Sequence, residues 1–247
     1  MLLDVQGLVK TYRRRGETFA AVDHLSFTLD AGELLVLAGE SGSGKSTTGR
    51  LIAQFSTPDD GKIILDGQDI THVPERKKKE LYRHIQMVFQ NPMRSFHPRY
   101  TLRESILAGI RNYHLTFTEQ ELQDLLKEVQ LPVERLDRYP HEVSGGECQR
   151  AAILRALCIK PQILLCDEAT SALDVSTRGE VAAMIRNACK RHQIGCLFIT
   201  HDLLLARRLA DRVMVMHNGR AVETGTPNDI FTNPKEAYTK ELLASLL

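Results

Sequence analysis

Apolar residues over the first 75 positions occur in the patterns of β-strands. Leu25, Phe27 and Leu29 alternate with other positions, which is the period of a strand with one buried face. Residues 34–38 form a continuous apolar run that indicates a fully buried strand, and residues 61–67 indicate a strand that ends in an Asp-Gly turn. The first third of the chain is therefore predicted to be rich in strands.

Helical patterns begin near residue 91 and continue to about residue 146. Apolar residues there recur at i, i+3, i+4 and i+7, as in Leu122, Leu125, Leu126 and Val129. From residue 147 to 224 helices and strands alternate, with helices expected at 147–158, 178–191 and 203–209 and strands at 163–166, 196–200 and 212–216. The order predicts one α/β domain with a catalytic core (1–90 and 147–227), a helical subdomain (91–146) and a helical tail (228–247).

The segment after the strand at 34–38 matches the phosphate-loop pattern G-x-x-x-x-G-K-S. It consists of Gly39, Glu40, Ser41, Gly42, Ser43, Gly44, Lys45 and Ser46, and Thr47 opens the helix that is expected next. Glycines let successive backbone N–H groups turn toward phosphate oxygens at the positive end of that helix. Lys45 is expected to reach the β- and γ-phosphates of ATP, and Ser46 to ligate Mg²⁺. A plain Gly/Ser-rich turn is the alternative, but the Lys-Ser pair at the right spacing favours a nucleotide site.

The strand at 163–166 ends in two acids, Asp167 and Glu168. We expect Asp167 to hold the Mg²⁺ shell and Glu168 to polarise the attacking water, because phosphoryl transfer depends on positioning and charge stabilisation. An apolar run that ends in Asp-Glu is also typical of a strand followed by a solvated turn. The phosphate loop upstream is what favours the catalytic interpretation.

A further motif follows the predicted helical subdomain. Ser144, Gly145, Gly146, Glu147 and Cys148 resemble the signature of the ABC transporter ATPases, in which Gln usually stands where this chain has Glu147. Residues 171–174, which end in Asp174, resemble the D-loop of the same family. The order of these motifs makes the chain similar to the nucleotide-binding subunit of an ABC transporter over nearly its whole length.

The same resemblance extends to three single residues. Gln90 matches the Q-loop glutamine, His201 the switch histidine, and Tyr12 the aromatic residue that stacks on adenine. The resemblance implies that Gln90 bridges Mg²⁺ or water and that His201 acts on the γ-phosphate and the water. It also implies a P-loop NTPase (RecA-like) core, with an N-terminal antiparallel β region and an inserted helical subdomain.

Each of these residues also has a simpler interpretation. Tyr12 could be an edge-strand aromatic, Gln90 a loop residue, and His201 a hydrogen-bonded histidine at a strand end. Ser144 could be no more than the N-cap of a helix that begins with two glycines.

A finer resemblance lies in residues 89–99 and 233–239, which are similar to importers for dipeptides, oligopeptides and nickel. It implies an ATPase that dimerises around two ATP molecules with a second ABC ATPase subunit, identical or homologous. It also implies two transmembrane permease subunits, an extracytoplasmic substrate-binding protein and a peripheral location on the cytoplasmic face of the membrane. Members that serve nickel or metallophore uptake are often short like this chain. The expected cargo is nickel, a metal chelate, a dipeptide or an oligopeptide.

Composition supports a soluble α/β domain and argues against nucleic acid as a partner. The 247 residues carry a formal net charge of +1, and the sequence pI is about 7.7. The basic run at 75–80 is expected to be a solvated helix face, with a phospholipid or permease contact as the alternative. No stretch reaches the roughly 18 apolar residues that a membrane span needs. Five cysteines in apolar stretches are expected to be reduced core thiols: Cys148, Cys158, Cys166, Cys189 and Cys196.

Two other classes of function remain possible from the sequence. One is a soluble ABC ATPase outside transport, of the translation or DNA-repair type, although the chain has a single set of motifs and no sustained heptads. The other is a regulatory nucleotide binder without hydrolysis, which the presence of Glu168 and His201 makes the weaker choice.

Overall fold

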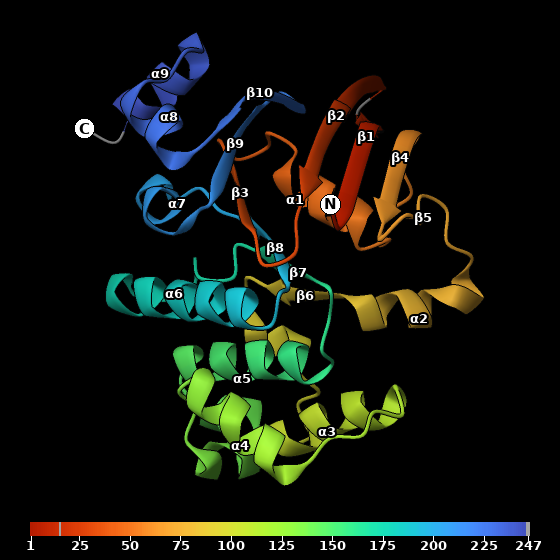
Figure 1. Cartoon of the computed structure of the whole chain (residues 1–247), viewed down its shortest axis with the longest axis vertical. Helices are drawn as coiled ribbons and strands as arrows, with labels where there is room; N and C mark the ends of the chain where they lie inside the picture. Colours follow the sequence, from red (N-terminus) through yellow and green to blue (C-terminus); the bar gives the residue numbers. More distant parts are fainter. Residues whose placement is uncertain (15, 246–247) are drawn as a thin grey trace.

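Two β-sheets form the centre of the protein in the computed structural model, which describes residues 1–14 and 16–245 (Figure 1). The first sheet is antiparallel, in the order β2-β1-β4-β5. Its strands are β1 (Leu3–Arg14), β2 (Glu17–Leu29), β4 (Asp60–Leu65) and β5 (Gln68–Asp69). It corresponds to the strand-rich region that the alternating pattern predicts.

The second sheet has the order β10-β9-β3-β8-β7-β6. Its strands are β3 (Leu34–Ala38), β6 (Ile85–Phe89), β7 (Ile163–Asp167), β8 (Gly195–Ile199), β9 (Arg212–His217) and β10 (Arg220–Gly225). All of them run parallel except β10, which pairs antiparallel with β9. The carboxyl ends of β3, β8, β7 and β6 therefore lie along one edge of the sheet, where ligands of open α/β sheets bind.

The parallel strands are apolar on both faces because each face is covered. Leu34 and Val36 of β3 join one buried cluster, which extends into the helices, whereas Leu35 and Leu37 join a second cluster. The second cluster contains the antiparallel sheet and α1 (Lys45–Ile52), and the first contains α6 (Val175–Arg191) and α7 (Leu203–Leu209). This explains why residues 34–38 read as a continuous apolar run rather than an alternating one.

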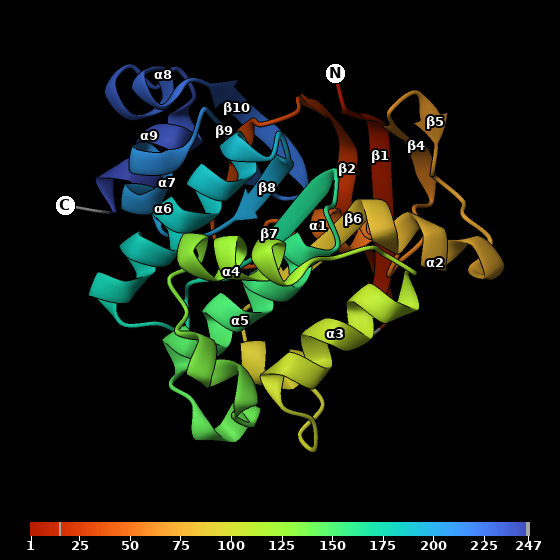
Figure 2. The same cartoon turned by 60° about the horizontal axis from the view of Figure 1, so that its bottom comes forward.

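The remaining helices before β7 are α2 (Glu75–His84), α3 (Leu102–Asn112), α4 (Glu119–Glu128) and α5 (Gly145–Cys158), with 3₁₀ turns η1 (Pro92–Ser95), η2 (Val133–Asp137) and η3 (Pro140–Glu142). Helices α3, α4 and α5 lie together at the end of the molecule that comes forward in Figure 2, whereas α2 lies at the side, near the antiparallel sheet. Thr101, Thr118 and Ser144 begin α3, α4 and α5 with capping boxes, each completed by a Glu three residues later. Two short helices, α8 (Pro227–Thr232) and α9 (Ala237–Ala244), follow β10.

The elements differ from the predicted boundaries by a few residues, and a helix cap explains one of these differences. The helix expected at 178–191 begins at Val175, because the Asp174 carboxylate accepts a hydrogen bond from the Thr177 N–H and caps it. The helix after the phosphate loop begins at Lys45 rather than Thr47, and the strand expected at 196–200 spans Gly195–Ile199. The predictions of element type are confirmed, and the errors are boundaries of a few residues.

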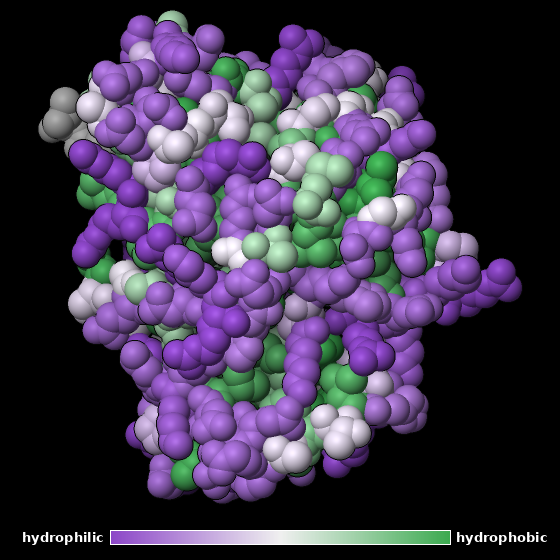
Figure 3. All heavy atoms as spheres, in the orientation of Figure 1, coloured by the Kyte–Doolittle hydropathy of each residue, from purple (hydrophilic) through white to green (hydrophobic). Residues whose placement is uncertain are grey.

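The surface and the thiols also match the expectations. The face in Figure 3 is mainly hydrophilic, with hydrophobic patches over the N-terminal strands and between the lower helices. Helix α2 buries only Leu81 and is exposed along its basic run. All five cysteines are buried and free, and burial raises the pKa of Cys148 to about 11 and of Cys158 to about 12. No helix within the described ranges is both long enough and apolar enough to cross a membrane.

Candidate nucleotide site

The parallel order of the second sheet brings distant residues to one edge of the sheet, beside a hollow. Each functional segment lies at the carboxyl end of a strand: the phosphate loop follows β3, Gln90 follows β6, Asp167 ends β7 with Glu168 directly after it, and His201 comes shortly after β8. The hollow has a volume of about 650 Å³. Among the predicted site residues, those that line it are Ser41, Ser46, Gln90, Asp167 and Glu168.

The phosphate loop depends on glycine at two close approaches. Gly39 and Gly44 both have positive φ, of 143° and 104°. A Cβ at Gly39 would collide with the carbonyl oxygen of Met216, and one at Gly44 with that of Ala21. The loop is therefore held against β9 on one side and β2 on the other, in a conformation that only glycine adopts at these positions.

Lys45 is folded back onto its own loop. Its Nζ donates to the carbonyl oxygens of Gly39 (2.8 Å) and Glu40 (2.7 Å), and the residue is 5% exposed. Burial lowers the pKa of Lys45, whereas the nearby acids, Glu168 first, oppose that shift. The ammonium is thus a desolvated positive charge held inside the phosphate loop.

The side chains of Ser46 and Asp167 are in direct contact in the nucleotide hollow. The Ser46 Oγ donates to the Asp167 Oδ1 at 2.7 Å. Burial raises the pKa of Asp167, and the hydrogen bond from Ser46 opposes the rise. A hydroxyl, a carboxylate and the Gln90 amide on one hollow form a set of hard oxygen donors, which is the chemistry that Mg²⁺ prefers.

Glu168 lies at a strained position beside His201. Its φ is +50°, which is uncommon for a residue with a side chain, and its backbone N–H donates to the Ile199 carbonyl at 3.0 Å. The Glu168 Oε1 lies 3.2 Å from the His201 Nδ1. The strand ends of β7 and β8 therefore present a carboxylate and an imidazole together.

The signature residues line a different hollow, of about 380 Å³, with the D-loop residue Asp174. Ser144 caps α5: its Oγ accepts from the Glu147 N–H, while the Glu147 Oε2 accepts from the Ser144 N–H at 2.9 Å. Arg135 Nε donates to the other Glu147 oxygen at 2.6 Å. The pKa of Glu147 is lowered, mainly by the hydrogen bond that its carboxylate accepts from the Ser144 backbone N–H. Glu147 is therefore an ionised acid paired with Arg135.

Tyr12 lies apart from both hollows, on β1. It is 38% exposed, its ring lies 6.1 Å from that of Phe19 between centroids, and the Lys10 Nζ is 5.6 Å from its ring centre. An exposed aromatic face is what stacking on a base requires.

Sequence reasoning missed several residues at these sites. Arg50 and Arg94 line the nucleotide hollow and add positive charge to it. Arg178 holds the D-loop, donating to the carbonyls of Leu173 (2.8 Å) and Ser171 (3.0 Å). Of these residues, only Arg50 could have been predicted from the sequence. It lies one helical turn after Ser46, and positions four apart share a helix face.

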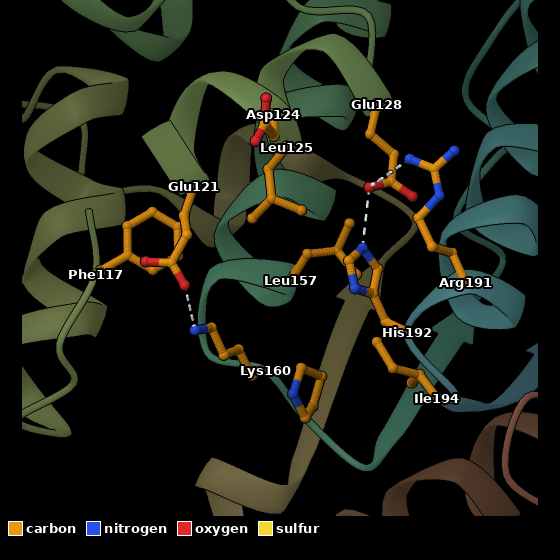
Figure 4. A pocket seen from close by; sticks show the side chains of 11 residues that line it. Phe117, Glu121, Asp124, Leu125, Glu128, Leu157, Lys160, Arg191, His192 and Ile194 are labelled. Atoms are coloured by element: carbon orange, nitrogen blue, oxygen red, sulfur yellow. Dashed lines mark hydrogen bonds and ion pairs between the residues drawn. The ribbon is translucent and has the colours of Figure 1, made fainter. Parts of the chain in front are cut away.

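A third hollow, of about 510 Å³, contains none of the predicted site residues (Figure 4). Pro161 and Ile194 on its wall precede β7 and β8, so it lies toward the amino edge of the sheet. Glu121 pairs there with Lys160 at 2.6 Å, and the Glu128 Oε2 lies 3.0 Å from the His192 Nε2. It is separate from the nucleotide hollow.

Comparison with known proteins assigns the family. A family model described as ABC transporter matches residues 22–171. The chain belongs to the ABC transporter family. Among its relatives, the peptidoglycan transport ATP-binding protein YejF of Agrobacterium fabrum is 41% identical over 99% of this chain and 47% of its own length. The oligopeptide transport ATP-binding protein OppF of Salmonella typhimurium is 40% identical over 93% of this chain and 70% of its own length.

Solved structures agree with this assignment. A dimeric post-hydrolysis state of the ATP-binding cassette MJ0796, bound to ADP and Pi, matches with a TM-score of 0.81 and 26% identity, covering 92% of this chain and 99% of that one. The predictions of an ABC ATPase fold and of an ATP-binding ABC ATPase domain are confirmed. The chain spans about half the length of YejF, and the roles of single residues stay predictions.

Proposed function

We propose that this chain is the ATP-hydrolysing subunit of a peptide importer. The observation that carries the proposal is the convergence of Lys45, Asp167 and Glu168 on the carboxyl edge of one parallel sheet. A buried cation, a half-buried carboxylate and a second carboxylate beside an imidazole are the groups that positioning and charge stabilisation of a transferring phosphoryl group require.

Mg²⁺ fits the donor set of Ser46, Asp167 and Gln90. When bound it neutralises charge on the β- and γ-phosphates. Asp167 favours a cation because burial disfavours its own charge, as the raised pKa shows. When ATP binds, the Lys45 ammonium gives up its hydrogen bonds to the loop carbonyls and donates to phosphate oxygens instead. Arg50 and Arg94 add positive charge to the lining of the hollow.

Glu168 and His201 carry the hydrolytic step in this proposal. Glu168 accepts a hydrogen bond from the attacking water and draws its proton, as a general base does. His201 orients that carboxylate and contacts the γ-phosphate. The strained φ of Glu168 supports a functional constraint at this position.

The separation of the two hollows supports a shared site between two subunits. Ser144 and its glycines line a hollow distinct from the one that holds Ser46, so they are free to contact the ATP of a second ABC ATPase subunit, identical or homologous. The division into a catalytic core (1–90 and 147–227), a helical subdomain (91–146) and a tail (228–247) belongs to the same proposal.

Exposed aromatic residues beside Gln90 support a membrane partner. Phe55 and Phe89 are 52% and 38% exposed, and their rings stack at 6.3 Å, with Met93 exposed close by in sequence. We assign this patch to contact with two transmembrane permease subunits, which would hold the chain peripherally at the cytoplasmic face. An extracytoplasmic substrate-binding protein would supply the cargo.

Peptide is the cargo that the relatives favour, because they are named for oligopeptide and peptidoglycan transport. Nickel stays a prediction from sequence. The test is ATP-driven uptake into proteoliposomes that contain this chain with the permease and binding protein encoded beside it, comparing a labelled oligopeptide with nickel. Peptide uptake that stops with Lys45→Ala supports the proposal, and ATP hydrolysis without uptake of any peptide overturns it.

A further inference from the structure

A carboxylate stands in the first turn of α5, beside the signature serine. The Glu147 N–H donates to the Ser144 Oγ at 3.2 Å, and the Glu147 Oε2 accepts from the Ser144 N–H at 2.9 Å. The Glu147 side chain is 25% exposed, and it lines the hollow of about 380 Å³ together with Ser144. The carboxylate therefore belongs to the group of residues that we assign to the ATP of a second subunit.

This hollow carries much negative charge for a place that receives a phosphate. The described residues that line it include three acids, Glu147, Asp174 and Glu180, and one cation, Arg150. The cation is engaged by one of these acids, because the Arg150 Nη2 lies 3.2 Å from the Glu180 Oε2. A hydrogen bond from the Ser176 hydroxyl, first among the causes, lowers the pKa of Asp174, so Asp174 is ionised as well. Like charges that face each other across an interface oppose association, so a γ-phosphate needs the charge of Glu147 to be neutralised.

Arg135 supplies this neutralisation from the turn η2. Its Nε donates to the Glu147 Oε1 at 2.6 Å, in a short hydrogen bond between charged groups. Both carboxylate oxygens of Glu147 are thereby engaged, one by Arg135 and the other by the Ser144 N–H. We propose that Arg135 is a positioning residue of the shared ATP site, which holds and neutralises Glu147 so that Ser144 can receive the γ-phosphate of a second subunit. The inference rests on the shared site of the proposed function.

The substitution Glu147→Gln separates this role from a merely structural one. It removes the negative charge but keeps a side-chain oxygen that accepts from the Ser144 N–H, since capping boxes take Gln as well as Glu. Arg135 is then no longer required, and Arg135→Ala should do little harm in the Glu147→Gln background. If Arg135 served only to pack or to hold η2, Arg135→Ala would do equal harm in both backgrounds.

The experiment compares wild type, Arg135→Ala, Glu147→Gln and the double variant, each as the full chain. Sedimentation with Mg²⁺ and a slowly hydrolysed ATP analogue gives the dissociation constant of the dimer, for the chain alone and with the second ABC ATPase subunit encoded beside it. We expect Arg135→Ala to raise this constant about tenfold or more, because an unneutralised acid then faces the phosphate. Glu147→Gln should dimerise at least as tightly as wild type, and the double variant should stay within about threefold of Glu147→Gln.

Arg103→Ala is the matched control. The Arg103 Nε donates to the Asp137 Oδ1 at 2.7 Å, so this variant removes another Arg–acid pair from the same turn η2 while Glu147 keeps its partner. It should dimerise like wild type. The inference is overturned if Arg135→Ala dimerises like wild type, if Glu147→Gln does not rescue it, or if Arg103→Ala weakens the dimer equally. A wild type that binds ATP but dimerises neither with itself nor with the second subunit would contradict the shared site of the proposed function, and the inference would fall with it.

Discussion

The Glu168 carboxylate and the His201 imidazole meet at the ends of neighbouring strands, with Oε1 3.2 Å from Nδ1. β7 delivers the acid and β8 the histidine, and the two strands are paired in parallel with Asp167 opposite Ile199. The pairing brings the backbones of the two residues close together before any ligand is considered. Each of the two can therefore be tested through its effect on the other.

His201→Ala should slow ATP hydrolysis by about 10²-fold, the usual worth of a group that assists proton transfer, with ATP affinity changed by less than about twofold. Steady-state phosphate release and nucleotide titration check this. His192→Ala is the control, since it breaks a similar His–Glu contact, with Glu128 at 3.0 Å, in the third hollow. A His201 variant that hydrolyses ATP as fast as the control would make His201 a bystander.

Asp167→Asn should raise the melting temperature of the protein. It should also slow Mg²⁺-dependent ATP hydrolysis by about 10²-fold or more. Burial raises the pKa of Asp167, so the folded protein binds that proton more readily than the unfolded chain. The cost of the buried charge is therefore complete at neutral pH and disappears as pH falls through the raised pKa toward the ordinary value.

Melting curves without nucleotide at several pH values test whether the Asp167 charge destabilises the fold. The Asn variant should melt above wild type at pH 7, and the difference should narrow in acid, because Asn still accepts the Ser46 hydrogen bond. An Asn variant that melts below wild type at pH 7 would show that the Asp167 charge stabilises the fold.

Tyr12→Ala should weaken nucleotide binding by about 1–3 kcal/mol, the range for one base–aromatic stack, whereas Tyr12→Phe should change it little. Titration of both variants with a fluorescent ATP analogue decides the matter. Equal affinities of the Ala variant and wild type would assign Tyr12 to packing with Phe19, its neighbour at 6.1 Å.

Much of this site could be predicted from sequence because its motifs each follow a buried strand. Parallel strands place their carboxyl ends together, so the order of β3, β8, β7 and β6 gathers Lys45, Glu168 and Gln90 without further information. The motif residues and the type of the strands before them were enough to predict the α/β fold and the edge of the sheet where these residues gather.

Other features depend on contacts that no local pattern carries. The Arg135 side chain that neutralises Glu147 lies twelve positions away on a 3₁₀ turn, and it accounts for an acid in the signature. The helix start at Val175 was missed because the Asp174 cap, not apolar periodicity, decides it.

Ser144→Arg should leave the chain's own ATP affinity intact and abolish ATP-induced dimerisation. The long guanidinium side chain would fill the hollow shared with Asp174, and its steric bulk would keep out the γ-phosphate that we propose docks there from a second subunit. Thr118→Arg is the control, because it disrupts the same kind of capping box at α4, outside that hollow. Size-exclusion chromatography with Mg·ATP compares them. A Ser144 variant that dimerises and hydrolyses normally would remove Ser144 from the shared site.

The central claim, that ATP is hydrolysed at the end of β7, is tested most directly with Glu168→Gln. Phosphate release and ATP affinity are measured on the purified variant and on wild type, with dimer formation followed in the same samples. The account predicts ATP binding within about twofold of wild type, hydrolysis slower by about 10²-fold or more, and accumulation of the ATP-bound dimer. Near-normal turnover by Glu168→Gln would contradict it.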